Sequence, residues 1–284
     1  VLIDRDQAAA ERGKAYAEKA LAKQVERGRM AADKAQAILA RITASTDYGL
    51  LHDADMVVEA VFEDRAIKAD VTRKLDAVLP AHCVLATNTS ALPITLLAQA
   101  SARPNRFIGL HFFSPADKMP LVEVIRGKAT SDATLAQALD FVAQLKKTPI
   151  VVNDSRGFFT SRFIGAFVDD AIGMVAEGIA PALIDNCARH AGMPVGPLAI
   201  TDELSIELSV NAGQAQAKEF PGEYKPGRSV PVLTRLYELG RMGKKAGKGF
   251  YDYGPDGKTL WPGLAELYPL KEVQPSPHDL KQRI

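Results

Sequence analysis

The chain has 284 residues, of which 47% are hydrophobic and 24% charged, and its formal net charge is +1. This composition is that of an ordinary globular protein, and the near-zero charge argues against a nucleic-acid-binding or membrane-surface protein. Two domains are expected at this length. Cys83 and Cys187 form no metal or redox motif. We expect reduced thiols in a cytosolic enzyme, with a disulfide between them as the alternative.

The first residues, "VLIDRD", lack an initiator methionine and have the pattern of a strand interior. The polar, Ala-rich segment that follows has no apolar core, which excludes a signal peptide there. No apolar run approaches the roughly 20 residues that would span a bilayer. We therefore expect a cytoplasmic protein of bacterial type, in which the first domain begins before Val1.

Strand and helix patterns alternate through the first half of the chain. The apolar run 56–61 predicts a strand covered on both faces, and the spacing in 64–79 predicts an amphipathic helix. The other predicted elements are helices at 7–27, 31–42, 92–98 and 134–146 and strands at 83–90, 106–113, 121–127 and 148–154. This alternation indicates a doubly wound α/β domain of Rossmann type over 1–154, with its N-terminal part missing.

The pattern beyond residue 154 is helical. The segment 157–178 is apolar over more than half of its helical circumference, which predicts a nearly buried helix. Further helices are predicted at 181–191, 197–210 and 230–239, and β alternation returns only at "GKGFYDY". We expect an all-α second domain over 155–284, in which the polar, Pro-containing tail 273–284 is a linker or a loose end.

Polar residues occur where the predicted parallel strands end. In open α/β sheets, ligands bind beyond the carboxyl ends of the strands. The clusters that fall there are Asp4, 59–63, 88–90 and 111–114. Each cluster alone is better explained as a turn or a helix cap, but together they favour a binding site at this edge.

Glu123 lies inside the apolar strand "LVEVI", where an unpaired carboxylate is costly to desolvate. His111 lies on the preceding predicted strand, so the two side chains can form a pair in which the carboxylate orients the imidazole and stabilises its cation. Two alternatives remain. Glu123 faces solvent if its strand is at the edge of the sheet, and His111 is an ordinary core residue if it has no functional partner.

Three long motifs, "TNTSALPI", "FIGLHFFSPADKMPLVEVI" and "NDSRGFFTSR", resemble those of the L-3-hydroxyacyl-CoA dehydrogenase family, and the resemblance runs through essentially the whole chain. The later "PVLTRLYELGRMGKKAGKGFYDY" is more similar to the α subunit of the multifunctional fatty-acid β-oxidation enzyme, where a crotonase-type hydratase domain precedes the dehydrogenase. The resemblance implies NAD-dependent oxidation of an L-3-hydroxyacyl-CoA to the 3-ketoacyl-CoA. It also implies a homo- or hetero-oligomer, with a thiolase subunit as a candidate partner.

The resemblance implies residue roles by position. His111 is implied as the general base that takes the proton of the 3-hydroxyl group, and Glu123 as the acid that orients it. Ser90 and Ser161 would contact the substrate, and Asp4 would bind the adenosine ribose hydroxyls. The full set of implied NAD-binding residues is Asp4, Val61, Phe62, Glu63, Lys68, Ser90 and Ser114.

The chain departs from the family pattern at two places. Ser161 stands where the family usually has an asparagine, and a shorter side chain there implies altered rather than absent activity. The Gly-rich turn that approaches the pyrophosphate should precede Asp4, so the first strand, this turn and the first helix are expected to be missing. The glycines of 240–249 follow no strand and form a turn instead.

Other functions stay open on the sequence alone. A stand-alone 3-hydroxyacyl-CoA dehydrogenase is one alternative, and a cofactor-deficient fragment that serves as a scaffold, for example for a thiolase subunit, is another. A β-hydroxyacid or sugar-nucleotide dehydrogenase would use a lysine of the helical domain as its catalyst. Residues 157–178 contain no lysine, which argues against that class.

Overall fold

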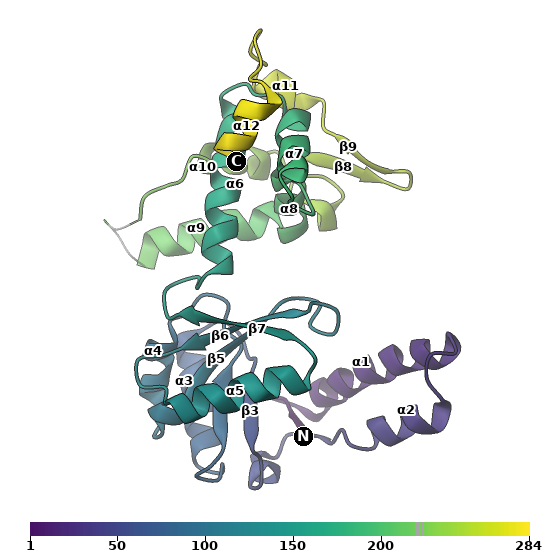
Figure 1. Cartoon of the computed structure of the whole chain (residues 1–284), viewed down its shortest axis with the longest axis vertical. Helices are drawn as coiled ribbons and strands as arrows, with labels where there is room; N and C mark the ends of the chain where they lie inside the picture. Colours follow the sequence, from purple (N-terminus) through teal and green to yellow (C-terminus); the bar gives the residue numbers. More distant parts are fainter. Residues whose placement is uncertain (220–221, 223) are drawn as a thin grey trace. The chain divides into compact units, whose positions relative to one another are not determined.

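The computed structural model describes the chain except for residues 220, 221 and 223. It divides into two compact units, Val1–Phe159 and Thr160–Ile284, each of which has its own core (Figure 1). Among the described residues, no helix combines the length and the apolar character that crossing a bilayer requires.

The first unit is built around a five-stranded sheet with the order β3-β4-β5-β6-β7. Its strands are β3 (Met56–Glu59), β4 (Val84–Thr87), β5 (Phe107–Phe112), β6 (Leu121–Arg126) and β7 (Thr148–Asn153). Strands β3, β4 and β5 are parallel, whereas β6 is antiparallel to β5 and parallel to β7. The sheet is therefore mixed, because a short connection joins β5 directly to β6. The expected Rossmann-like α/β architecture is confirmed.

A second, two-stranded parallel sheet joins β1 (Leu2–Ile3) to β2 (Ala44–Ser45). The chain between these strands forms α1 (Gln7–Glu26) and α2 (Ala32–Leu39), which lie side by side and project from the rest of the first unit (Figure 1). Helix α1 begins where the Asp6 carboxylate accepts a hydrogen bond of 2.7 Å from the amide of Ala9. In the described part of the chain, no strand pairing joins the two sheets.

Helices cover both faces of the five-stranded sheet. Helices α3 (Arg65–Asp76) and α4 (Ile94–Leu97) pack on one face and α5 (Asp132–Gln144) packs on the other. The short 3-10 helices of this unit are η1 (Tyr48–Leu51), η2 (Ala98–Ala100) and η3 (Pro104–Arg106). Gly109 of β5 is required by the close approach of α4, because a Cβ atom there would lie 2.7 Å from Cδ1 of Ile94. This packing holds the start of α4 against the strand that carries His111.

The second unit is helical with one β-hairpin. Its elements are α6 (Thr160–Ala176), α7 (Pro181–His190), α8 (Pro197–Leu204), α9 (Ile206–Glu219), α10 (Val230–Glu238), η4 (Lys244–Ala246), β8 (Tyr251–Gly254), β9 (Gly257–Leu260), α11 (Gly263–Leu267) and α12 (Pro277–Arg283). The helix predicted over 157–178 buries mainly its second half. The prediction of a single helix over 197–210 is wrong, because the helix is interrupted at Ser205, which has a φ of 85°. The Ser205 hydroxyl then accepts from the amide of Leu208 at the start of α9.

The expectation of a loose tail is also wrong. Ser276 and Pro277 start helix α12, and the Ser276 hydroxyl accepts a hydrogen bond from the amide of Asp279. Leu280 is only 1% exposed and belongs to the core of the second unit. A few apolar residues in a polar segment are a weak sequence signal, yet Leu280 and Ile284 pack α12 against the core.

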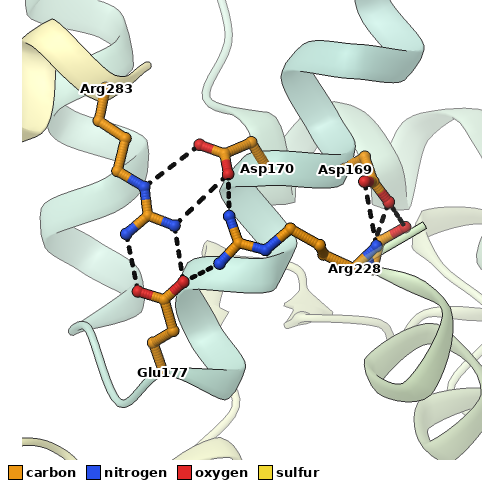
Figure 2. A network of polar contacts seen from close by, with 6 residues as sticks. Asp169, Asp170, Glu177, Arg228 and Arg283 are labelled. Carbon is orange, nitrogen blue, oxygen red and sulfur yellow. Dashed lines mark hydrogen bonds and ion pairs between the residues drawn. The ribbon is translucent and has the colours of Figure 1, made fainter.

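Charged side chains hold α12 to α6 (Figure 2). Arg283 lies 2.6 Å from the Glu177 carboxylate and 3.3 Å from that of Asp170. Arg228 reaches the same two carboxylates from the segment before α10. Two guanidinium groups and two carboxylates thus form one network around α6, with the last helix of the chain as a member.

Candidate active site

The centre of the candidate site is a buried pair formed by His111 and Glu123. The two residues are opposite each other in the antiparallel register of β5 and β6, which places both side chains on the same face of the sheet. The Nδ1 atom of His111 lies 2.8 Å from Oε2 of Glu123, and the two residues are 7% and 0% exposed. The predicted pair is therefore present. The edge-strand alternative is wrong, because β6 lies between β5 and β7.

Both oxygens of the Glu123 carboxylate are held. The amide of Phe159 donates to Oε1 over 3.1 Å, while Oε2 contacts His111. With Nδ1 directed at the carboxylate, the favoured tautomer of His111 carries its proton on Nδ1 and its lone pair on Nε2. The rings of Phe113 and Phe158 lie 4.6 Å and 6.2 Å from the imidazole, which lowers the local polarity. This arrangement suits a general base.

The turn between β4 and α4, residues 88–93, is attached to the strand of His111. The Asn88 side chain accepts a 2.8 Å hydrogen bond from the amide of Phe112, and the Asn88 amide donates to the carbonyl of Glu59. Ser90 lies exposed in the same turn. The structure thus brings the turn of Ser90 against the end of β5, one residue beyond His111.

Glu63 fastens the turn of Ser90 to the segment that follows β3. Its Oε1 atom accepts hydrogen bonds from the Thr89 hydroxyl at 2.6 Å and from the amides of Ser90 and Ala91 at 2.9 and 3.1 Å. Burial alone would raise the pKa of Glu63, but these donors and the nearby Lys68 ammonium together hold it below its ordinary value. Glu63 is therefore a carboxylate that holds the backbone of residues 89–91 in place.

Lys68 is 1% exposed and fully engaged by acceptors of the protein. Its Nζ atom lies 2.9 Å from Glu59 Oε1, 3.2 Å from the Val61 carbonyl and 3.5 Å from Glu63 Oε2. Three acceptors match the three protons of an ammonium group. The other oxygen of Glu59 accepts from the Thr87 hydroxyl at 2.7 Å. Lys68 therefore organises the segment 59–63 directly, and its approach to a cofactor stays a prediction.

The sequence placed Glu59 and Asn88 in the polar clusters at the strand ends but gave neither a specific partner, and it assigned no role to Asp154. The signal for Glu59 was present, because a carboxylate ending an apolar strand needs a cation and Lys68 follows on the next helix. The position of Asn88 shortly before a predicted helix indicated only a helix cap. Asp154 was only the last residue of the strand predicted over 148–154.

Of the remaining candidate residues, Val61 joins this network through its backbone, because its amide donates to Glu59 Oε1 and its carbonyl accepts from Lys68. Phe62 is 78% exposed, and Val61 and Ser114 are exposed as well, with the Ser114–Pro115 peptide bond in the cis form. Asp4 follows β1, where its carboxylate accepts from the amide of Arg5. Within the described residues, no contact joins Asp4 to the other candidates. Ser161 lies in the first turn of α6, in the second unit.

Comparison with known proteins identifies the family. Residues 1–155 match the family model described as "3-hydroxyacyl-CoA dehydrogenase, NAD binding domain", and residues 157–253 match "3-hydroxyacyl-CoA dehydrogenase, C-terminal domain". The chain belongs to the 3-hydroxyacyl-CoA dehydrogenase family. This is a family of NAD-dependent oxidoreductases, so the resemblance found in the sequence motifs is confirmed.

Relatives within this family include subunits of a larger enzyme. The chain is 38% identical over 261 residues to the fatty acid oxidation complex subunit alpha of Shewanella baltica and 40% identical over 261 residues to that of Shewanella amazonensis. Each alignment covers 92% of this chain but 36% of the relative. The chain thus spans about a third of the length of these relatives.

Solved structures of the family share the fold. The (S)-3-hydroxybutyryl-CoA dehydrogenase PaaH1 from Ralstonia eutropha matches with a TM-score of 0.80 and 32% identity, and FadB2 of M. tuberculosis matches with 0.77 and 34%. Both matches cover 89% of this chain and 89% of the other chain. Both units therefore have counterparts in these dehydrogenases.

The candidate residues of the first unit include groups of the kinds that NAD binds. Asp4 carries a carboxylate suited to ribose hydroxyls, and Val61, Phe62, Ser90 and Ser114 are exposed, with two apolar side chains and two hydroxyls among them. The described turns of the first unit offer no comparable groups for the pyrophosphate. The described strand-to-helix turns after β1, β3 and β4 contain no glycine, and the amides of several of their residues already donate to Glu59 and Glu63.

Proposed function

We propose that this chain carries the NAD-dependent oxidation of an L-3-hydroxyacyl-CoA to the 3-ketoacyl-CoA, as the dehydrogenase part of a multifunctional hydratase/dehydrogenase of fatty-acid β-oxidation. The observation that carries the proposal is the buried His111–Glu123 pair beside the turn of Ser90. The size of the Shewanella relatives supports the multifunctional setting. A stand-alone dehydrogenase is the second candidate, supported by the fold match with PaaH1.

In the proposed mechanism, Nε2 of His111 takes the proton of the substrate's 3-hydroxyl group while the C3–O bond becomes a carbonyl. When bound, NAD⁺ would supply the acceptor for the hydride of C3. Glu123 offsets the positive charge that develops on the imidazole, and the Ser90 hydroxyl hydrogen-bonds the substrate oxygen. Ser161 is proposed to contact the substrate, in the role that the family usually gives to asparagine.

The variant His111→Gln tests this function. The complete protein is assayed in the reverse direction with acetoacetyl-CoA and NADH, and NADH binding is followed separately by fluorescence titration. Loss of a general base is expected to lower kcat about 10²–10⁴-fold and to leave the NADH affinity unchanged. Near-normal turnover of the variant would refute the assignment of the base. A parent protein without a saturable NADH response would favour the scaffold alternative.

We also propose that the protein works in an oligomer with a thiolase subunit as partner, in the cytoplasm. The relatives named as subunits of a fatty acid oxidation complex support the assembly. Cys83 and Cys187 are both free thiols, as proteins of a reducing compartment usually have. Sedimentation of the protein with and without a thiolase subunit tests the assembly.

A further inference from the structure

We propose that Asp154 is a positioning residue for the His111–Glu123 pair. It acts through residues 154–159, which we name the exit segment because they end the first unit. The proposal rests on the proposed function of the pair as a base and its acid. The amide of Phe159, at the end of this segment, donates to Glu123 Oε1, so the path of the exit segment decides how the carboxylate is held.

Asp154 fixes the beginning of the exit segment. Its Oδ1 and Oδ2 atoms accept hydrogen bonds of 2.7 Å each from the amides of Ile94 and Thr95, the first residues of α4. Amides in the first turn of a helix have no partner within the helix and favour a negative charge. One carboxylate, directly after β7, therefore joins the exit segment to the helix that follows the turn of Ser90.

The middle of the exit segment has a conformation that requires such an anchor. Gly157 and Phe158 are both left-handed, with φ angles of 70° and 47°. A bulky residue seldom adopts this conformation, and it persists only where surrounding contacts enforce it. Phe158 is nevertheless fully buried, beside His111, and the amide of Gly157 donates to the carbonyl of Ala91.

The contacts form a continuous route from Asp154 to the base. Asp154 fixes the start, the left-handed turn places Phe158 under the imidazole, and the amide of Phe159 holds Glu123 at the end. Without the anchor, the turn can relax toward ordinary backbone angles and withdraw this amide. Glu123 then loses this hydrogen bond, and the imidazole of His111 is held less firmly in its orientation. Loss of the Asp154 anchor should therefore lower kcat and leave the affinity for NADH unchanged.

A double-mutant cycle with Glu123 tests the coupling. In the complete protein, Asp154→Ala is expected to lower kcat for acetoacetyl-CoA reduction at least tenfold without changing the NADH dissociation constant. Asp154→Asn, which retains one acceptor oxygen, is expected to lie between the parent and Asp154→Ala. Because Asp154 acts through Glu123, the double variant with Glu123→Gln should be no slower than Glu123→Gln alone. Additive losses would overturn the proposal.

Asp76 supplies the matched control. Its carboxylate also ties down a distant backbone amide of the first unit, that of Ala102 at 2.7 Å, and it pairs with Arg103, but it belongs to no contact of the candidate site. Asp76→Ala is expected to lower the midpoint of thermal unfolding and to leave kcat unchanged. An equal loss of kcat in this control would mean that Asp154→Ala acts by general destabilisation.

Hydrogen exchange separates this proposal from the proposed function. Asp154→Ala, or Asp154→Asn if the alanine variant does not fold, is expected to speed amide exchange in 157–159 more than elsewhere in the first unit. Unchanged exchange there would overturn the anchoring role even in an active enzyme. A parent protein without dehydrogenase turnover would refute the proposed function instead, while the exchange result would still decide whether Asp154 fixes the exit segment.

Discussion

Glu63 is a single carboxylate that holds three donors of another segment, and its ionisation is linked to stability. The hydrogen bonds from Thr89, Ser90 and Ala91 are made to the charged form, which explains why its pKa lies below the ordinary value although burial opposes this. A carboxylate with a lowered pKa in the folded state adds stability above its unfolded pKa of about 4.5. That contribution is lost as the pH falls through the lower, folded value.

The variant Glu63→Gln tests this linkage. The neutral amide cannot ionise, so the difference in unfolding free energy between parent and variant should be largest near pH 7 and should shrink as the pH falls below about 4.5. Urea unfolding at pH 7, 5 and 3.5, monitored by far-ultraviolet circular dichroism, measures the difference. A constant difference over this range would show that the charge of Glu63 is not what holds the Thr89–Ala91 backbone.

At the scale of elements, the end of α5 shows how backbone conformation limits stability. Lys146 follows the helix with a φ of 56°, and the amides of Lys146 and Lys147 donate back to the carbonyls of Ala143 and Val142. This left-handed position after a helix favours glycine, since a Cβ atom is disfavoured there. The side chain of Lys146 is exposed, so little is lost with it.

Lys146→Gly is therefore expected to stabilise the protein by about 0.5–1 kcal/mol. Lys19→Gly, the same substitution in the interior of α1, is the matched control and should destabilise by roughly 1 kcal/mol. Urea unfolding of both variants under identical conditions checks the opposite signs. Two losses of similar size would contradict the argument.

The contacts before the β8–β9 hairpin explain a glycine motif that resembles a phosphate-binding turn. The Asp202 carboxylate accepts from the amides of Phe250 and Tyr251 and from the Tyr253 hydroxyl. A Cβ atom at Gly249 would lie 1.9 Å from this carboxylate. Glycine is needed here because a buried side chain fills the space, and the expected turn has a structural function.

Features of the fold and of the site were predictable only where particular side chains or an apolar pattern indicated them. The His111–Glu123 pair could be predicted, because both strands had clear apolar patterns and a carboxylate inside one of them needed a partner. The hydrogen bond from Phe159 could not, because every residue except proline has a backbone amide. The break at Ser205 also lacked a signal, since neither glycine nor proline marks it.

At the scale of the whole molecule, the two units have separate cores, and the second depends on its last helix. Leu280 of α12 packs into the core of the second unit, whereas the ion pairs of Arg283 lie at a partly exposed surface. Apolar burial should therefore contribute more to the docking of α12 than the charges in Figure 2 do.

Leu280→Ala is expected to destabilise the second unit by about 2–5 kcal/mol, and Arg283→Ala by no more than about 1 kcal/mol. The single tryptophan, Trp261, packs against the core of the second unit, so its fluorescence reports the unfolding of that unit. Urea titrations of both variants followed by this signal give the comparison. A larger effect of Arg283→Ala would mean that the ionic contacts dominate.

The position of Leu280 has a consequence for the newly made protein. Ribosomes add about 5–20 residues per second, so residues 160–280 take on the order of ten seconds to synthesise. Throughout that interval the apolar sides of α6 and α7 have no α12 to cover them. Nascent chains halted before residue 280 should for this reason bind chaperones more strongly than chains halted well after it.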